Sequence, residues 1–235
     1  MPALVGPVLQ EAELARLVLI PGAGGIAWYW HRVVPLLEDA GHEAIAVDFP
    51  GDDRNAGLTV YADLTVEAIG AGYPILVAQS LGGFTAPLVC ERVPVRMLVF
   101  VNAMIPAPGE TPGEWGENTG AAPARTEAAH RGGYSPDFDL VTYFFHDVPA
   151  DVVEQGEARE REEADTIFSK PCRFQAWPDV PIRVIAGRDD RLFPIGFQRR
   201  VAKERLGVAV DELAGGHLIA LSNPRGLVDQ LLTYL

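Results

Sequence analysis

The fold of this chain can be predicted from the sequence Ile75-Leu76-Val77-Ala78-Gln79-Ser80-Leu81-Gly82-Gly83-Phe84. Its apolar start predicts a buried parallel strand, and helical spacing of apolar residues begins after Ser80. A serine at such a switch, with small residues two positions before and after it, is typical of a nucleophile elbow. We therefore expect a strained backbone at Ser80, with Ala78 in place of the usual first glycine. A serine that caps an ordinary helix is the alternative.

The composition indicates one globular domain with a large core. The chain has 235 residues, of which 48% are hydrophobic, and it has no apolar run near the roughly 20 residues that a membrane helix requires. Its formal net charge of −13 argues against nucleic acid and anionic membranes as partners. Cys90 and Cys172 have neither metal-ligand spacing nor the density of a disulfide scaffold. Residues 1–11 lack the basic start of a signal peptide, so we expect a cytoplasmic location.

Strand and helix patterns alternate along the chain, which predicts an α/β fold with a mostly parallel sheet flanked by helices. The pattern is interrupted once, between residues 105 and 179. Residues 106–125 are rich in Pro, Gly, Glu and Thr without periodicity, which predicts a mobile loop. The expected strands are 16–21, 43–49, 75–78, 96–103, 181–187 and 208–213, and the expected helices are 26–40, 58–71, 137–147, 150–168, 195–206 and 223–235.

We interpret residues 105–179 as a cap inserted into a core formed by residues 1–104 and 180–235. The cap contains the aromatic run Tyr143-Phe144-Phe145, which has no clear place in the predicted sheet. These rings either cover Ser80 or only anchor the insertion. The second alternative is open because aromatic side chains dominate core burial.

Four small residues, Gly22-Ala23-Gly24-Gly25, directly follow the first predicted strand. Small residues at the carboxyl end of a strand let backbone N–H groups face outward, which suits an oxyanion hole or a phosphate cradle. The phosphate interpretation is weak, because no Lys-Ser/Thr pair follows and the G-x-G-x-x-G spacing fails at Trp28. Trp28 either packs in the core or lines a pocket near this loop.

Ser80, an acid and His217 all follow predicted strands at their carboxyl ends, where active sites form in open α/β sheets. A serine hydroxyl is a poor nucleophile until an imidazole takes its proton, and a carboxylate must orient that imidazole. His217 follows two glycines after the last predicted strand. The rival base, His146, lies in the insertion, which is a poor place for a rigid base.

The acid is expected in the stretch Gly187-Arg188-Asp189-Asp190-Arg191-Leu192-Phe193-Pro194. The order serine, aspartate, histidine, with the acid in a G-x-x-D-x-x-x-P stretch, resembles the α/β-hydrolase superfamily. The resemblance implies that Asp190 is the acid and that Asp189 faces solvent or an arginine. It also implies an oxyanion hole formed by the backbone N–H groups of Ala23 and Leu81.

Further residues narrow this resemblance: Pro21 to Gly25, Trp28, Trp30, Val33 to Leu37, Gly41, His42, Asp48 to Gly51, the elbow, and Gly215 to Leu218. In these stretches the chain resembles a small-esterase branch of the superfamily, which includes plant-type methyl esterases and hydroxynitrile lyases. Pro21 and Gln79 stand where the branch usually has histidine, and Leu218 stands where its lyases have lysine. A lyase is therefore less favoured than an esterase.

We therefore predict a serine hydrolase that cleaves a small carboxylic ester through an acyl-enzyme, with Ser80, His217 and Asp190 as its triad. The chemistry requires no cofactor and no metal. Two alternatives stay open: hydrolysis of a lactone or a C–C bond, and a ligand-binding protein that keeps the triad as a pocket. The residues expected to bind substrate are Gly22, Trp28, Met104 and Phe144.

Overall fold

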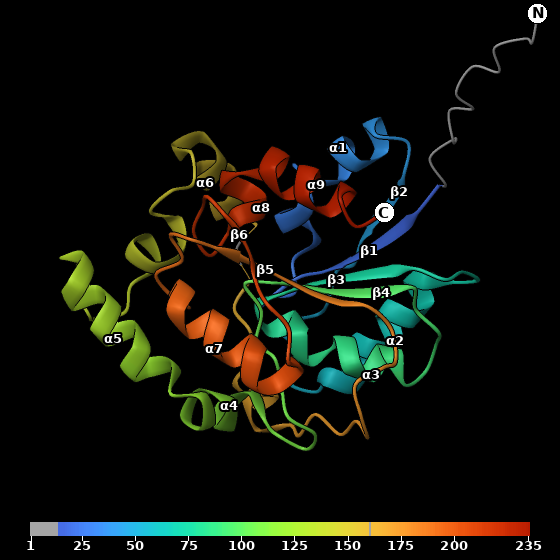
Figure 1. Cartoon of the computed structure of the whole chain (residues 1–235), viewed down its shortest axis with the longest axis horizontal. Helices are drawn as coiled ribbons and strands as arrows, with labels where there is room; N and C mark the ends of the chain where they lie inside the picture. The colour runs from blue at the N-terminus through green and yellow to red at the C-terminus, as the bar shows by residue number, and fades with distance from the viewer. Residues whose placement is uncertain (1–13, 160) are drawn as a thin grey trace, which may run out of the picture.

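The computed structural model describes residues 14–159 and 161–235. In this part of the chain, six strands form one sheet in the order β2-β1-β3-β4-β5-β6, and every neighbouring pair is parallel (Figure 1). The predicted parallel α/β sheet is confirmed, whereas the signal-peptide prediction for residues 1–11 lies outside the described residues. The strands are β1 (Arg16–Ile20), β2 (Glu43–Ala46), β3 (Ile75–Gln79), β4 (Met97–Val101), β5 (Ile182–Gly187) and β6 (Asp211–Leu213).

The register of the strands brings the loops at their carboxyl ends together. Ile20 of β1 lies opposite Ala78 of β3, and Gln79 of β3 lies opposite Val101 of β4. On the other side, Gly187 of β5 lies opposite Leu213 of β6. Because all the strands run in the same direction, the loops after β1, β3, β4, β5 and β6 meet at one edge of the sheet.

Helices cover both faces of the sheet (Figure 1). Successive side chains of a strand point to opposite faces, so a strand covered on both sides is apolar throughout. In β1, Val18 and Ile20 pack in the cluster of α2, α3 and α7, whereas Leu17 and Leu19 pack in the cluster of α1, α8 and α9. The helices are α1 (Val34–Asp39), α2 (Leu58–Ile69), α3 (Ala86–Cys90), α7 (Ile195–Leu206), α8 (Ile219–Ser222) and α9 (Pro224–Leu232).

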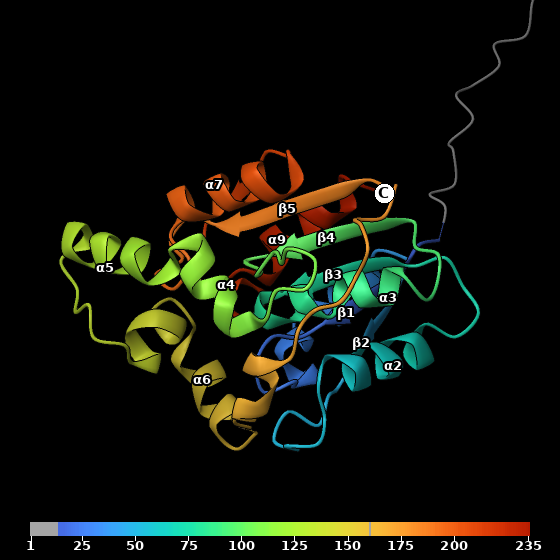
Figure 2. The ribbon, with the colours of Figure 1, turned by 90° about the horizontal axis from the view of Figure 1, so that it is seen from below.

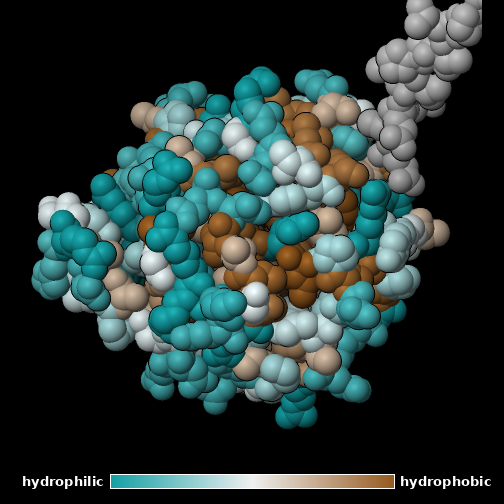
Figure 3. Space-filling view, in the orientation of Figure 1, coloured by the Kyte–Doolittle hydropathy of each residue, from teal (hydrophilic) through white to brown (hydrophobic). Residues whose placement is uncertain are grey.

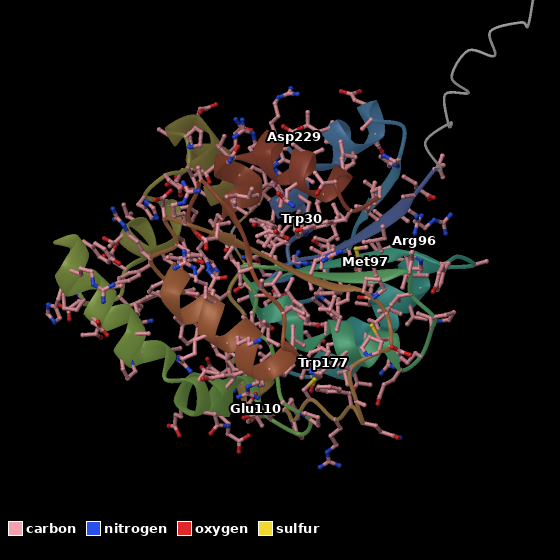
Figure 4. The ribbon with its side chains drawn as sticks, viewed as in Figure 1. Trp30, Arg96, Met97, Glu110, Trp177 and Asp229 are labelled. Carbon is pink, nitrogen blue, oxygen red and sulfur yellow. The ribbon has the colours of Figure 1, made fainter. Side chains whose placement is uncertain are left out.

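The single helix predicted over residues 26–40 is wrong. The structure has a 3₁₀ turn, η1 (Ala27–Trp30), followed by the short helix α1. Pro35 lies in the first turn of α1, where its missing N–H is tolerated, and it would have broken a continuous helix. Trp30 is fully buried between α9 and the sheet (Figure 4).

The chain between β4 and β5 is mostly helical. Figure 2 shows α4, α5 and α6 beside the end of the sheet toward which β5 points. The elements between β4 and β5 are α4 (Pro112–Thr119), α5 (Ala121–Gly132), the π-helical turn η3 (Val141–Phe145), α6 (Ala150–Glu157) and the 3₁₀ turn η4 (Asp165–Ser169). The predicted helix over 150–168 therefore ends early, at Glu157. The division of the chain into a core and a cap stays a prediction.

The mobile loop predicted over residues 106–125 is wrong, because this stretch contains α4 and the start of α5. A capping box begins α4: the Glu114 N–H donates to Thr111 Oγ1 over 3.1 Å, and the Thr111 N–H donates to Glu114 Oε2 over 2.9 Å. Buried Trp115 donates its indole N–H to the Ile105 carbonyl over 3.0 Å. Helix α4 is therefore stabilised by local capping and by one buried tryptophan, and not by an apolar stripe.

Glu110 anchors this segment to α7. Its carboxylate is buried and lies 2.9 Å from the Arg205 guanidinium, and it also accepts a hydrogen bond from the Asn118 amide over 2.8 Å (Figure 4).

At the open edge of the sheet the covering by helices is thinner. Figure 3 shows apolar residues at the surface over β5, between α7 and α9, where Ile182 and Val210 are half-buried.

Within residues 14–159 and 161–235, no helix is long and apolar enough to cross a membrane. In the same part of the chain, no group of three or more His, Cys, Asp or Glu side chains could hold a metal ion. Both cysteines are free thiols, and burial raises the pKa of Cys90 and Cys172 to about 12. The thiols are therefore protonated at neutral pH.

Candidate active site

Ser80 lies at a sharp turn between β3 and the 3₁₀ turn η2 (Ser80–Phe84). Its φ of 48° places it in the left-handed region, so the expected strained backbone is confirmed. The turn tolerates only small neighbours, because a Cβ atom at Gly82 would lie 2.4 Å from the Pro21 carbonyl oxygen. The Met104 N–H donates to the Ser80 carbonyl over 3.0 Å and fixes the turn from the end of β4.

The three predicted side chains meet at the carboxyl edge of the sheet. Ser80 Oγ lies 3.0 Å from His217 Nε2, and His217 Nδ1 lies 2.9 Å from Asp190 Oδ2. A carboxylate that accepts the Nδ1–H proton leaves the Nε2 lone pair to accept the serine proton. The arrangement can therefore move a proton from the hydroxyl to the imidazole and stabilise the resulting charge.

All three side chains are shielded from water. The exposed fraction is 8% for Ser80, 4% for Asp190 and 0% for His217. Two aromatic rings stand edge-on to the imidazole: the centroid of Phe144 lies 5.0 Å from that of His217, and the centroid of Phe193 lies 5.1 Å from it. Burial strengthens the electrostatic interactions among these groups, because fewer water molecules screen them.

Asp190 is held by its own loop. Its Oδ1 atom accepts the N–H groups of Leu192 over 2.8 Å and of Phe193 over 2.9 Å, which leaves Oδ2 for the imidazole. The neighbouring Asp189 is exposed and accepts the Gly215 N–H over 3.1 Å, so the two aspartates have different surroundings.

A buried amide network, which the sequence interpretation missed, connects the acid and base loops. Asn102 has a φ of 45°, and its Nδ2 donates to the carbonyls of Gly216 over 2.9 Å and His217 over 3.0 Å. Its Oδ1 accepts the Gly187 N–H over 2.7 Å, and Gln198 donates to Asp190 Oδ2 over 3.2 Å. The available signal for Asn102 was a polar residue that directly follows an apolar strand.

The segment between β4 and β5 also contacts the base loop. Asp147 Oδ2 accepts the Gly216 N–H over 2.6 Å, next to His217 in the chain. His146, the rival base of the sequence prediction, also lies here, because a Cβ atom at Gly216 would be 2.7 Å from its Nε2. Burial lowers the pKa of His146. The contact with Ser80 is made by His217, whereas His146 packs against the loop that carries His217.

The glycine loop lies against Ser80. A Cβ atom at Gly22 would lie 2.4 Å from Gln79 Oε1 and 2.8 Å from Ser80 Cβ, so only glycine fits here. Buried Gln79 reaches the base from the same side, with its Nε2 3.4 Å from His217 Nε2. Ala23 follows in the chain and is exposed. The loop thus borders the place where a carbonyl attacked by Ser80 would lie.

The structure separates the residues that were expected to bind substrate. Gly22 and the backbone of Met104 contact the elbow, and Phe144 contacts His217. Trp28 instead stacks on His31, with ring centroids 4.2 Å apart, and the Arg159 guanidinium lies 5.4 Å from the Trp28 ring centre. The roles of these residues in substrate binding stay predictions.

Comparison with known proteins agrees with the observed fold. A family model described as the alpha/beta hydrolase family matches residues 17–230. Norfluorocurarine synthase 1 of a Strychnos species is 27% identical over 246 residues, which cover 90% of this chain and 92% of that protein. A pyrethroid hydrolase of Sphingobium wenxiniae is 28% identical over 242 residues, which cover 93% of this chain and 86% of that protein.

A solved structure gives the same result at the level of the fold. The crystal structure of polyneuridine aldehyde esterase superimposes with a TM-score of 0.77 and 22% sequence identity. The match covers 94% of this chain and 99% of the esterase chain.

Proposed function

Because this chain belongs to the alpha/beta hydrolase family, we propose that it is a serine hydrolase of small carboxylic esters. The observation that carries the proposal is the position of the His217 ring, 3.0 Å from Ser80 Oγ and 2.9 Å from Asp190 Oδ2. The names of two similar proteins, a pyrethroid hydrolase and polyneuridine aldehyde esterase, also support it. The cytoplasmic location stays a prediction.

The reaction begins with acylation of Ser80. As Ser80 Oγ attacks the ester carbonyl carbon, His217 Nε2 takes the hydroxyl proton, and Asp190 stabilises the imidazolium. The carbonyl oxygen becomes an oxyanion, which the N–H groups of Ala23 and Leu81 stabilise. When the tetrahedral intermediate collapses, the bond to the alcohol oxygen breaks, and the imidazolium gives its proton to the departing alcohol. The acyl group is then bound to Ser80 as an ester.

Deacylation repeats the same steps with water. His217 takes a proton from a water molecule that attacks the acyl carbonyl, and the second oxyanion lies in the same N–H pocket. Collapse of this intermediate releases the carboxylic acid, and the imidazolium returns the proton to Ser80 Oγ. The proton that leaves with the alcohol is replaced by one from water, so each turnover regenerates Ser80 and His217, and the cycle needs no cofactor.

The proposal is tested with a panel of p-nitrophenyl esters of increasing acyl length, a methyl ester and a lactone. We expect turnover of at least one short acyclic ester, and loss of that turnover in Ser80→Ala. Turnover of the lactone alone would instead support the first alternative. Binding of small carbonyl compounds without turnover of any of them would support a ligand-binding role and would contradict the proposal.

We propose that Phe144 contributes to the choice of acyl group. Its ring stands edge-on to His217 and comes from the segment that lies beside the carboxyl edge of the sheet. Removing the ring creates space near the reacting carbonyl, and pocket shape alone discriminates acyl chains by about 10-fold or more. We expect Phe144→Ala to change the ratio of kcat/KM for hexanoyl and acetyl esters by about that factor.

The matched control is Phe168→Ala, which removes an exposed ring from the same segment. It should leave the ratio unchanged. Both variants should still react with a fluorophosphonate. An unaltered ratio in folded Phe144→Ala would reduce Phe144 to a packing role.

A further inference from the structure

We propose that Glu163 is a positioning residue that holds the glycine loop in the geometry required for oxyanion stabilisation. Glu163 and Gly24 are separated by 139 positions in the sequence. The proposal rests on the proposed esterase function, and it assigns a role to a carboxylate that the reaction cycle does not use. It also makes the oxyanion site depend on the segment between β4 and β5.

Both oxygens of the Glu163 carboxylate accept a hydrogen bond. The Gly24 N–H donates to Oε2 over 2.8 Å, and the Tyr61 hydroxyl of α2 donates to Oε1 over 2.6 Å. Tyr61 is itself fixed, because its buried ring stacks on Phe49 with centroids 4.4 Å apart. The carboxylate therefore connects the glycine loop to a rigid helix.

The neighbouring Arg161 strengthens this connection. Its guanidinium donates to the carbonyls of Phe49 and, over 3.5 Å, of Gly24, and it lies 3.2 Å from Asp48 Oδ2. Its own backbone is also close, since a Cβ atom at Gly24 would lie 2.4 Å from the Arg161 carbonyl oxygen. The peptide groups before and after Gly24 are thus both held by residues of this segment.

The glycine loop needs such support. Gly24 and Gly25 have φ values of 83° and 68°, and glycine visits many other conformations at little cost. Ala23, whose N–H is the proposed oxyanion donor, directly precedes Gly24. An oxyanion hole is most effective when its donors are fixed before charge develops, so movement of Ala23 together with an unanchored Gly24 would lower kcat.

The pKa of Glu163 helps to distinguish a positioning role in catalysis from a role in stability alone. Burial raises the pKa of Glu163, although the hydrogen bonds from Tyr61 and Gly24 and the charge of Arg161 oppose that shift. Tyr61 and Arg161 are the charged or titratable groups that face it, and Arg161 also pairs with Asp48 and Asp52.

A carboxyl whose pKa is raised by folding stabilises the protein while it is protonated, and this contribution is lost as the pH rises through the raised value. Ionisation of Glu163 therefore lowers the stability of the folded protein relative to the protonated form. Glutamine has the same shape and no charge, so the melting temperature of Glu163→Gln relative to wild type should increase as the pH rises from acid to neutral. A positioning role predicts lower activity in the same variant.

The test measures kcat, KM and the affinity for a trifluoromethyl ketone, which forms a tetrahedral adduct and mimics the transition state. A single amide oxygen in Glu163→Gln replaces two carboxylate oxygens, so we expect kcat and ketone affinity to fall by about 10-fold, with KM nearly unchanged. Glu163→Ala, which removes both acceptors, should lose about 100-fold. Exposed Glu162 supplies the matched control, and Glu162→Gln should behave as wild type.

Wild-type kcat and ketone affinity in Glu163→Gln would overturn the proposal, and this variant decides the matter even if Glu163→Ala fails to fold. A raised KM with an unchanged kcat would also overturn it, because that pattern is a loss of uniform substrate binding and not of oxyanion stabilisation. Failure of the esterase function itself has a different signature: wild-type protein would then neither hydrolyse esters nor react with a fluorophosphonate at Ser80.

Discussion

Replacement of Ser80 by alanine is expected to lower kcat/KM for a short activated ester by at least about four orders of magnitude. The hydroxyl is the only group that forms the acyl-enzyme in the proposed cycle, and its Oγ lies 3.0 Å from the base. The remaining activity would come from binding and from the oxyanion donors, which act on water attack without the serine. The measurement is steady-state hydrolysis, with the melting temperature as the check on folding.

Ser222→Ala is the matched control for this experiment. Its Oγ is buried near Gly215 of the base loop and has no hydrogen-bond partner among the described residues, so its removal should leave kcat/KM unchanged. A loss of less than about 10-fold in folded Ser80→Ala would contradict the role of Ser80, since removal of a nucleophile costs far more.

Replacement of Asp190 by asparagine is expected to lower kcat by about four orders of magnitude. Asparagine keeps the shape but can present an N–H group to His217 Nδ1, which favours the tautomer with the proton on Nε2. That tautomer has no lone pair facing Ser80 Oγ. The protein should stay folded, because the amide oxygen of asparagine can accept the two backbone N–H groups, of Leu192 and Phe193, that Asp190 Oδ1 accepts.

Asp189→Asn controls for the loss of a charge at the next position. Asp189 is exposed and accepts only the Gly215 N–H among the described contacts, so the variant should keep activity within about twofold of wild type, as surface substitutions usually do. Equal losses in the two variants would contradict the assignment of Asp190, and a larger loss in Asp189→Asn would reverse it.

The sheet and the meeting of Ser80, Asp190 and His217 could be predicted because each depends on local sequence. Short apolar runs specify buried strands, and side chains that follow parallel strands meet at one edge. The strained elbow was equally visible, since small residues flank Ser80 on both sides. The choice of Asp190 over Asp189 came from the resemblance of the G-x-x-D-x-x-x-P stretch to the α/β-hydrolase superfamily.

What could not be predicted depends on contacts between distant segments or on weak local signals. Glu163 meets Gly24 and Tyr61 only because the segment before β5 folds back over the loop after β1. The side-chain amide of Asn102, which directly follows β4, likewise forms hydrogen bonds with Gly187 at the end of β5 and with Gly216 after β6. The helix α4 was missed because its signal is a capping box at Thr111, while its composition resembles that of a loop.

The central claim, that Ser80 is the nucleophile of an acyl-enzyme, is tested most directly by fluorophosphonate labelling followed by peptide mapping. The tryptic peptide of residues 55–92 contains Ser80 as its only serine, so the site of the adduct can be assigned without ambiguity. We predict one adduct per chain, carried by this peptide, absent from Ser80→Ala and formed far more slowly in Asp190→Asn. An adduct on another peptide, or labelling that persists in Ser80→Ala, would contradict the account.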